Sequence, residues 1–326
     1  MRKSANRILL LLIVYGALYG LARLANRMAA WGQAPKNVQI AFVSNRDRNN
    51  EIYVMDTNGE RQQNLTLHHA DDEQPAWSPD GKNIAFISYR ADDNAEIYVM
   101  DANGKNVHRL TQNPAWESDP TWSPDGRKIA FASDRDGNAE IYAMDSDGRN
   151  LVNLTNHPAH DIAPTWSPGG QKIAFASLRD GNTEIYVMDA AGGNPLRLTH
   201  HPVPDHFPAW SPDGRSIAFS STREEIWVDI YVMEVDGRNI LRLINSDSTD
   251  GCPAWSPDGQ QIAFASTRDQ IDDIYAVDVN GENLRNLTRH PARDSAPDWF
   301  DPNVARAVSP VDKRGVMWGW LKQMKR

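Results

Sequence analysis

The chain has 326 residues, with 43 acidic against 34 basic side chains and a single cysteine, Cys252. Residues 1–36 carry six Lys/Arg and no acid, residues 303–326 carry six Lys/Arg and one acid, and the middle of the chain holds 22 basic against 42 acidic residues. The acidic middle argues against a nucleic acid as partner, since phosphate binding needs a basic face. One cysteine cannot form an intrachain disulfide.

The first element in chain order is an apolar segment near the N-terminus. Arg2, Lys3 and Arg7 precede an uncharged run of 15 residues, 8–22, a pattern typical of a secretory signal peptide. The alternative is an uncleaved signal anchor, although 15 residues are few for a full membrane span. Residues 1–36 are therefore interpreted as signal peptide or anchor plus linker, which predicts an exported protein, periplasmic or membrane-anchored.

A motif of the form PxWSPDGxxIAFxSxR then recurs with a spacing of 44 or 45 residues. Its tryptophans are Trp77, Trp122, Trp166, Trp210, Trp255 and Trp299. A fixed period of this length marks a repeat architecture. The array enters at an Ile-Ala-Phe without a preceding tryptophan and leaves at Trp299 without a following Ile-Ala-Phe. The Ile-Ala-Phe segment at the start of the array and the tryptophan segment at its end together make up one complete repeat. This predicts a closed ring in which the last strand pairs with the first, instead of an open solenoid with capped ends.

Each copy contains four strand-like runs. In one copy we expect strands A, B, C and D at Pro120–Ser123, Lys128–Ser133, Glu140–Asp145 and Leu151–Thr155. A Ser-Pro-Asp-Gly turn joins A to B, and a second turn closed by glycine joins C to D. Four strands in each of six units predict an all-β fold, a six-bladed β-propeller over residues 37–302. Its blades are four-stranded and antiparallel, and the C-terminal strand joins the N-terminal blade.

The repeat resembles the TolB-type β-propeller repeat, of which residues 154–189, LTNHPAHDIAPTWSPGGQKIAFASLRDGNTEIYVMD, are a close instance. The resemblance covers residues 38–302 and implies a propeller of the bacterial cell envelope that serves as a binding platform. TolB proteins of the Tol–Pal system carry an α/β domain before the propeller. Here about 15 residues separate the apolar run from the first strand, so the chain is similar to a TolB-like protein without that domain.

Charged residues recur at the B–C and D–A loops, which share one face. Each strand B ends in Ser-x-Arg, each strand C begins with an acid, and another acid stands three residues before each strand-A proline. The last set comprises Asp72, Glu117, Asp161, Asp205, Asp250 and Asp294. In one interpretation these acids form a ring at the channel mouth that favours a cationic partner. In the other, each arginine forks between carboxylates of its own and the adjacent blade and fastens the ring.

Histidine recurs in the D–A loops at His68, His157, His201 and His290, with Asn113 and Ser246 in the other two copies. Because Asn and Ser replace it, the position is interpreted as a turn cap. Equivalent positions around a ring cannot converge on one ion, so no metal or other cofactor is expected. No GxSxG nucleophile elbow occurs, and no catalytic residue is assigned.

Apolar residues that break the repeat mark the candidate partner-binding site. Trp116 and Phe207 are expected in D–A loops, and Ile226, Trp227 and Ile271 in B–C loops of the same face. Large apolar side chains in otherwise polar loops are typical of recognition surfaces. The alternative is that they cover the rim or each other.

Three functions follow from these patterns. The first is a non-enzymatic, exported envelope propeller that binds a protein or peptide of cationic character. The second is a polysaccharide-active lyase or hydrolase that uses the channel-mouth carboxylates and the histidines. The third is a purely structural envelope protein.

Residues 303–326 are basic, with Met317, Trp320, Leu321 and Met324 at helical spacing. Membrane association is therefore expected through this tail or the N-terminal segment, unless the tail packs on the propeller.

Overall fold

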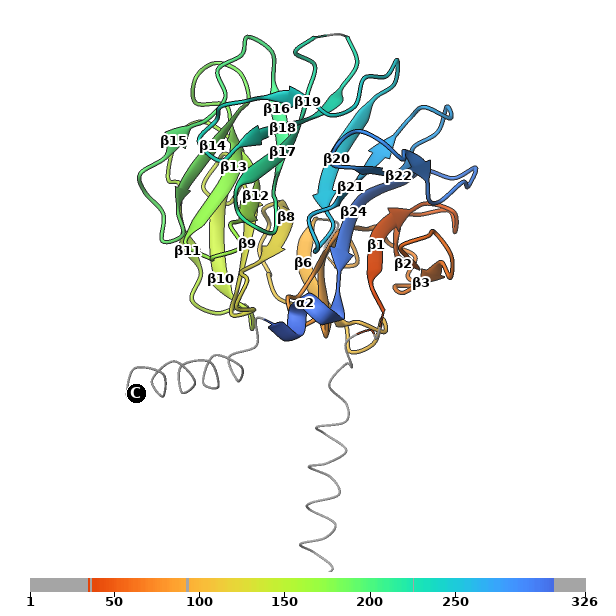
Figure 1. Ribbon diagram of the computed structural model, residues 1–326. Coiled ribbons are helices and arrows are strands. Elements are labelled where there is room, and N and C mark those ends of the chain that lie inside the picture. Colours follow the sequence, from red (N-terminus) through yellow and green to blue (C-terminus); the bar gives the residue numbers. More distant parts are fainter. Residues whose placement is uncertain (1–34, 36, 92–93, 225, 308–326) are drawn as a thin grey trace, which may run out of the picture.

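The computed structural model describes residues 35, 37–91, 94–224 and 226–307. The strands of this part of the chain form six four-stranded antiparallel sheets arranged in a ring (Figure 1). The prediction of an all-β, six-bladed β-propeller is confirmed. The expected signal peptide or anchor and the amphipathic part of the tail lie outside the described residues.

Each blade runs from an inner strand A to a short outer strand D. Blade 1 contains β24 (Asp294–Phe300), β1 (Gln39–Ser44), β2 (Glu51–Asp56) and β3 (Gln63–Asn64). Blade 2 contains β4 (Asp72–Trp77), β5 (Asn83–Ser88), β6 (Glu96–Asp101) and β7 (His108–Arg109). Blade 3 contains β8 (Glu117–Trp122), β9 (Lys128–Ser133), β10 (Glu140–Asp145) and β11 (Val152–Asn153).

The remaining blades repeat this order. Blade 4 contains β12 (Asp161–Trp166), β13 (Lys172–Ser177), β14 (Glu184–Asp189) and β15 (Leu196–Arg197). Blade 5 contains β16 (Asp205–Trp210), β17 (Ser216–Ser221), β18 (Asp229–Glu234) and β19 (Leu241–Arg242). Blade 6 contains β20 (Asp250–Trp255), β21 (Gln261–Ser266), β22 (Asp273–Asp278) and β23 (Arg285–Asn286). A short helix, α2 (Pro302–Ala307), follows β24.

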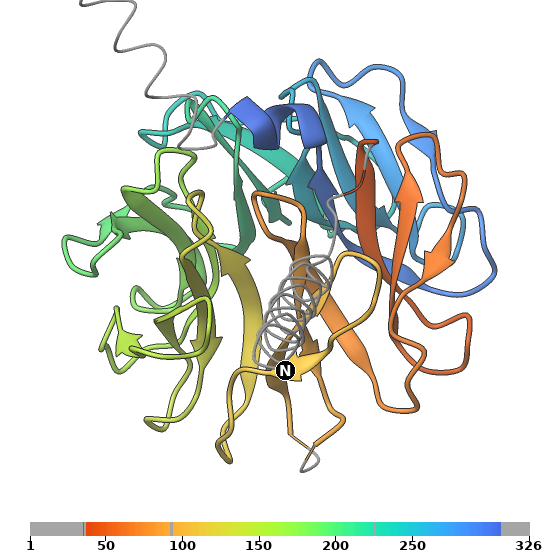
Figure 2. The ribbon, with the colours of Figure 1, turned by 90° about the horizontal axis from the view of Figure 1, so that it is seen from below.

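The ring closes where the two ends of the array meet. Strand β24, the last in the chain, pairs antiparallel with β1, the first, and Gln39 lies opposite Phe300. The expected closure by the C-terminal strand is confirmed. Described residues at both ends therefore lie on the same side of the ring, beside the A–B and C–D turns (Figures 1 and 2). We call this side the turn face and the opposite side, with the B–C and D–A loops, the loop face.

The Ile-Ala-Phe element explains why the blades stack in one sense around the ring. In β9, Ile129 and Phe131 pack towards blade 2, whereas Ala130 packs towards blade 4. Side chains alternate between the two faces of a strand, so one face of each blade carries large side chains and the other face carries small ones. Large and small faces interdigitate at each boundary between blades, and the hydrophobic core is divided among these boundaries.

Strand A begins earlier than the sequence predicts. Strands β9 and β10 have the expected bounds, but β8 begins at Glu117 instead of Pro120. Its register against β9 shifts between Ser118 and Thr121, as expected for a β-bulge. Proline is tolerated there because strand A is an edge of its sheet and needs no donor on its open side.

Among the described residues no helix is long and apolar enough to cross a membrane.

Candidate binding site

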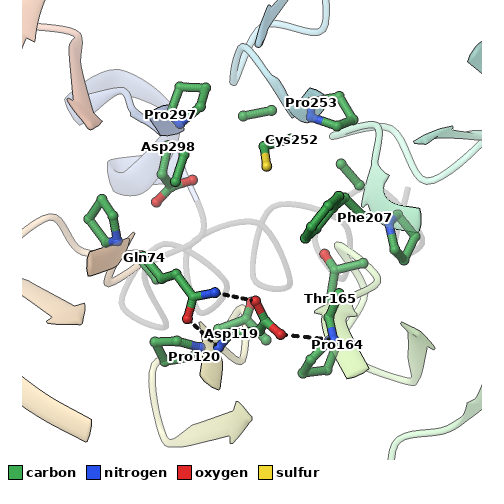
Figure 3. Close-up of a pocket in the computed structure, with 18 of the residues that line it drawn as sticks. Gln74, Asp119, Pro120, Pro164, Thr165, Phe207, Cys252, Pro253, Pro297 and Asp298 are labelled. Carbon is green, nitrogen blue, oxygen red and sulfur yellow. Dashed lines mark hydrogen bonds between the residues drawn. The ribbon is translucent and has the colours of Figure 1, made fainter. Parts of the chain in front are cut away.

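The six inner strands surround a central channel. Each contacts the inner strands of both neighbouring blades. The residue before the strand-A proline has a φ of 49° to 54° in all six blades and lines a cavity of about 300 Å³ (Figure 3). We call these residues the channel ring: Gln74, Asp119, Ala163, Phe207, Cys252 and Ala296.

A positive φ is uncommon for residues other than glycine, and for a bulky side chain it is a clear outlier. The channel ring adopts it in every blade, whatever the side chain, because the bulge imposes it. The consequence is a fixed backbone position that presents a variable side chain to the channel. Phe207, expected in a D–A loop, therefore lies in β16, and Cys252 lies in β20.

Asp119 connects three inner strands. Its Oδ1 accepts a hydrogen bond from Gln74 Nε2 at 2.7 Å, and its backbone N–H donates to Gln74 Oε1 at 2.8 Å. Its Oδ2 accepts from the backbone N–H of Ala163 at 3.2 Å (Figure 3). The same oxygen accepts from Ser118 Oγ at 3.1 Å. Burial raises the pKa of Asp119, and the hydrogen bonds from Ser118 and Ala163 oppose that shift.

A second carboxylate and a thiol face the same cavity. Asp298 Oδ2 accepts a hydrogen bond from the backbone N–H of Trp77 at 2.7 Å, and burial raises the pKa of Asp298 to about 7. Burial, with smaller contributions from Asp119 and Asp272, raises the pKa of the Cys252 thiol to about 12. Because the thiolate is the reactive form, Cys252 is a weak nucleophile at neutral pH.

The acids at the start of strand A are buried. In blade 4, Arg179 donates from its Nη2 to Asp161 Oδ2 at 2.8 Å, and its guanidinium lies 5.3 Å from the centroid of the Phe175 ring. The same pairing occurs within every blade, and the six carboxylates are Asp72, Glu117, Asp161, Asp205, Asp250 and Asp294. All six are at most 1% exposed. Each arginine binds the inner-strand acid of its own blade, so these carboxylates lie beneath the loop face.

The acids at the start of strand C have other partners. Glu184, for example, accepts hydrogen bonds from the side chain of Arg197 and from the backbone N–H of His201. In blade 4 the strand-C acid is thus held by its own D strand and the following loop. The six Ser-x-Arg arginines therefore pair with the six strand-A acids, and the six strand-C acids do not depend on them.

The recurrent histidine caps a turn, as its replacements indicate. His157 Nδ1 accepts the backbone N–H of Ala159 at 3.1 Å, and Asn113 Oδ1 accepts that of Ala115 at 2.8 Å. Each side chain thus bonds the backbone two residues on. In the described part of the chain no three His, Cys, Asp or Glu side chains are grouped so that they could hold a metal ion.

Several exposed apolar side chains lie on the loop face. Trp116, before β8, is 55% exposed and packs edge-on against Tyr89 with ring centroids 5.9 Å apart. Ile226 and Trp227, before β18, are 86% and 38% exposed. Leu178, after β13, is also exposed. Blades 2 to 5 therefore present an apolar row, which we define as Tyr89, Trp116, Leu178, Ile226 and Trp227; Tyr89 is partly buried and the other four are exposed.

Comparison with known proteins identifies the family. The model of the TolB beta propeller domain matches residues 75–159, 150–250 and 224–307, which together make up more than half of the chain. The chain belongs to this TolB beta propeller family. A 52-residue stretch is 40% identical to the Tol-Pal system protein TolB of Desulfosudis oleivorans (strain DSM 6200 / JCM 39069 / Hxd3) and spans 16% of this chain and 12% of that protein.

Solved structures agree with the family assignment. The crystal structure of TolB from Acinetobacter baumannii superposes with a TM-score of 0.72 at 25% identity, over 80% of this chain and 66% of that one. A chain of the nidogen/laminin complex superposes with a TM-score of 0.67 at 10% identity, over 82% of this chain and 99% of that one, and shows the fold alone.

Within this TolB-type propeller, sequence reasoning found part of the candidate site. It placed Trp116, Ile226 and Trp227 on the loop face, where they lie; Ile271 also lies in a B–C loop and is partly buried. It missed Tyr89 and Leu178, which stand between Ser and Arg of the Ser-x-Arg motif. That position is polar in the other four copies, and this difference is the available signal. It also missed Gln74, Asp119 and Asp298, which look like ordinary polar repeat residues.

Proposed function

We propose that this TolB-type propeller is an exported, non-enzymatic platform that binds an extended segment of a protein partner across its loop face. The observation that carries the proposal is the apolar row, in which Trp116, Leu178, Ile226 and Trp227 are exposed where most copies of the repeat have polar residues. Exposed apolar groups with a polar surround are typical of protein-binding surfaces.

The position of the row favours a polypeptide over a small molecule. Trp116 and Trp227 belong to blades 3 and 5, with Leu178 of blade 4 between them. An extended chain can follow several blades, whereas a small ligand needs an enclosing pocket. Trp116 is held in place, since Asp134 Oδ1 accepts its backbone N–H at 2.8 Å. A positioned aromatic side chain loses little conformational entropy on binding.

Charge favours a cationic segment. Residues 37–302 carry 22 basic and 42 acidic side chains. Asp119 and Asp298 add carboxylates to the channel, whose lining also includes the apolar ring of Phe207. Such a surface attracts basic partners and disfavours acidic ones.

Export is supported by the basic and apolar N-terminal segment and by the Tol-Pal system protein named above. The aligned part spans 12% of that relative, so its partners are not carried over to this chain.

The lyase or hydrolase alternative has no support in the geometry. A catalytic carboxylate must reach its substrate within hydrogen-bond distance. Glu117 and Asp161 are at most 1% exposed and bonded to arginine. His157 already accepts a backbone N–H through its Nδ1.

The test is capture of envelope proteins by the purified full chain, carried out by crosslinking and affinity pull-down. Trp116→Ala and Trp227→Ala should each reduce capture of a specific partner at least about tenfold, as expected for interface anchors. Leu196→Ala and Leu241→Ala are matched controls, since both side chains are exposed on the outer strands β15 and β19. Equal capture by all four variants would rule out the proposed site, and thermal unfolding would verify that each variant folds.

A further inference from the structure

The central channel contains two carboxyl groups that have no basic partner. Asp119 of β8 and Asp298 of β24 both line the cavity of about 300 Å³, and among the described residues its lining includes no Lys, Arg or His. The six buried acids at the start of strand A, by contrast, each pair with an arginine of the same blade. The channel therefore holds acidic groups that no described basic side chain neutralises.

Hydrogen bonds position both carboxyl groups without supplying a cation. Asp119 accepts from the side chain of Gln74 and from the backbone N–H of Ala163, and Asp298 accepts from the backbone N–H of Trp77. Burial raises the pKa of both groups, and no cationic side chain opposes either shift. A bound cation would favour the ionised form of both.

The two carboxyl groups lie in different layers of the channel. Strand A runs from the loop face to the turn face, so Asp298, which follows the strand-A proline, is two positions nearer the turn face than the channel ring that contains Asp119. The two residues come from blades 1 and 3, on different sides of the cavity (Figure 3). Residues two positions apart are about 6 to 7 Å apart along a strand. A ligand that contacts both groups must therefore be elongated.

The rest of the cavity lining is mostly apolar. It consists largely of the strand-A prolines and of alanines, and the ring of Phe207 faces the same space (Figure 3). Phe207 is 39% exposed and Cys252 is partly buried, so the cavity is open to solvent. A mostly apolar cavity with a few convergent polar groups is typical of a small-molecule site.

We propose that the channel binds a linear aliphatic diamine, with one ammonium group on Asp119 and the other on Asp298. Each ammonium group donates charge-assisted hydrogen bonds to a carboxylate, and the methylene chain lies along the prolines and alanines. Alkylammonium groups, with a pKa of about 10.4, are charged at neutral pH. The site does not include the apolar row, so its test is independent of the proposed protein partner.

The experiment is calorimetric titration of the full chain with putrescine, a four-carbon diamine, at pH 8, above the Asp298 pKa of about 7. Putrescine should bind at least about tenfold more tightly than butylamine, which has one ammonium group. Asp298→Asn and Asp119→Asn should each weaken putrescine binding at least about tenfold. Asp247→Asn removes the same charge from an exposed D–A loop and is the matched control. Thermal unfolding verifies that each variant folds.

The native thiol of Cys252 reports where the ligand binds. Cys252 is the only cysteine of the chain and lines the cavity (Figure 3). Putrescine at about ten times its Kd should slow the reaction of this thiol with methyl methanethiosulfonate about tenfold, because the bound ligand covers it. Ala296→Phe should also weaken binding, since it fills the cavity beside Asp298. Phe207 has the same positive φ, so this backbone position accepts a phenylalanine.

Several outcomes would overturn the proposal. Absence of putrescine binding, or equal affinity for putrescine and butylamine, would show that the two carboxyl groups do not act together. Equal effects of Asp298→Asn and Asp247→Asn, or an unchanged labelling rate at Cys252, would place the binding outside the channel. Calcium ions that bind more tightly than putrescine and displace it would assign the carboxyl groups to a metal ion instead.

Discussion

Gln74 and Asp119 exchange two hydrogen bonds across the boundary between blades 2 and 3. Gln74 Nε2 donates to Asp119 Oδ1, and the Asp119 backbone N–H donates to Gln74 Oε1. Both residues belong to the channel ring, and no other blade boundary has this pair of side chains. The repeat alone therefore does not determine how the inner strands are joined, since variable residues add specific contacts to it.

Gln74→Ala should lower the free energy of unfolding by about 1 to 3 kcal/mol, because it leaves the partly buried carboxylate of Asp119 with fewer donors. Alanine is compatible with the backbone, as Ala163 has the same positive φ. Denaturant unfolding measures the change. Gln112→Ala, at an exposed loop position, is the control and should change stability by less than about 0.5 kcal/mol. Equal effects of the two substitutions would contradict the role assigned to the pair.

Asp298→Asn should change how stability depends on pH. Burial raises the pKa of Asp298 to about 7, above its ordinary value of 3.8. Between these values the folded state binds more protons than the unfolded state, so the native protein loses stability as the pH rises from about 4 to about 7. Asparagine does not ionise, and its Oδ1 can still accept the Trp77 N–H.

The Asp298→Asn variant should therefore match the native protein near pH 4. At pH 8 it should be more stable by about 1 to 3 kcal/mol, a range that allows for partial solvent screening of the side chain. Denaturant unfolding at both pH values measures the difference. A constant offset at the two pH values would show that ionisation of Asp298 is not responsible.

The bounds of strands B and C were predictable because burial controls them. The Ile-Ala-Phe residues alternate large and small side chains between two covered faces, and β9 and β10 begin and end at the predicted residues. Ring closure was predictable because the array begins with an Ile-Ala-Phe segment and ends with a tryptophan segment, which together make up one repeat. Strand A was predicted to begin too late, because its first three residues lack an apolar pattern and contain a bulge.

The channel was less predictable than the fold. Phe207 and Cys252 were recognised as unusual but were expected in loops, since a residue before proline gives no sign of a positive φ. The recurrence of arginine and acids suggested ion pairs, yet sequence spacing did not reveal that Arg179 binds only the inner-strand acid of its own blade. Long-range packing determines which acid each arginine binds, because a buried charge is stable only when an opposite charge lies beside it.

Arg179→Met should lower the free energy of unfolding by at least about 3 kcal/mol, because it leaves the buried carboxylate of Asp161 without its cation. Arg127→Met is the matched control. The Arg127 side chain is 82% exposed and 3.9 Å from Asp125, so its loss should cost less than about 0.5 kcal/mol. Thermal or denaturant unfolding distinguishes the two, and a similar cost at both sites would argue against buried fastening of the blades.

Tyr231→Phe should be neutral or stabilise the protein by up to about 1 kcal/mol. Tyr231 is 1% exposed, and among the described residues its hydroxyl has no hydrogen-bond partner. The equivalent Tyr275 of blade 6 donates to Asp269 and accepts from Asn286. Removing an unpaired buried hydroxyl removes a desolvation cost, whereas removing a paired one leaves its partners unsatisfied.

Tyr275→Phe should accordingly destabilise the protein by about 1 to 3 kcal/mol, and this opposite effect on the same side chain makes it the control for Tyr231→Phe. Both changes are measured by denaturant unfolding at neutral pH, where tyrosine is protonated. If Tyr231→Phe also costs more than about 1 kcal/mol, its hydroxyl has a partner after all. The B–C loop of blade 5, which carries Ile226 and Trp227, would then be fastened to the core of its blade in the same way as the loop of blade 6.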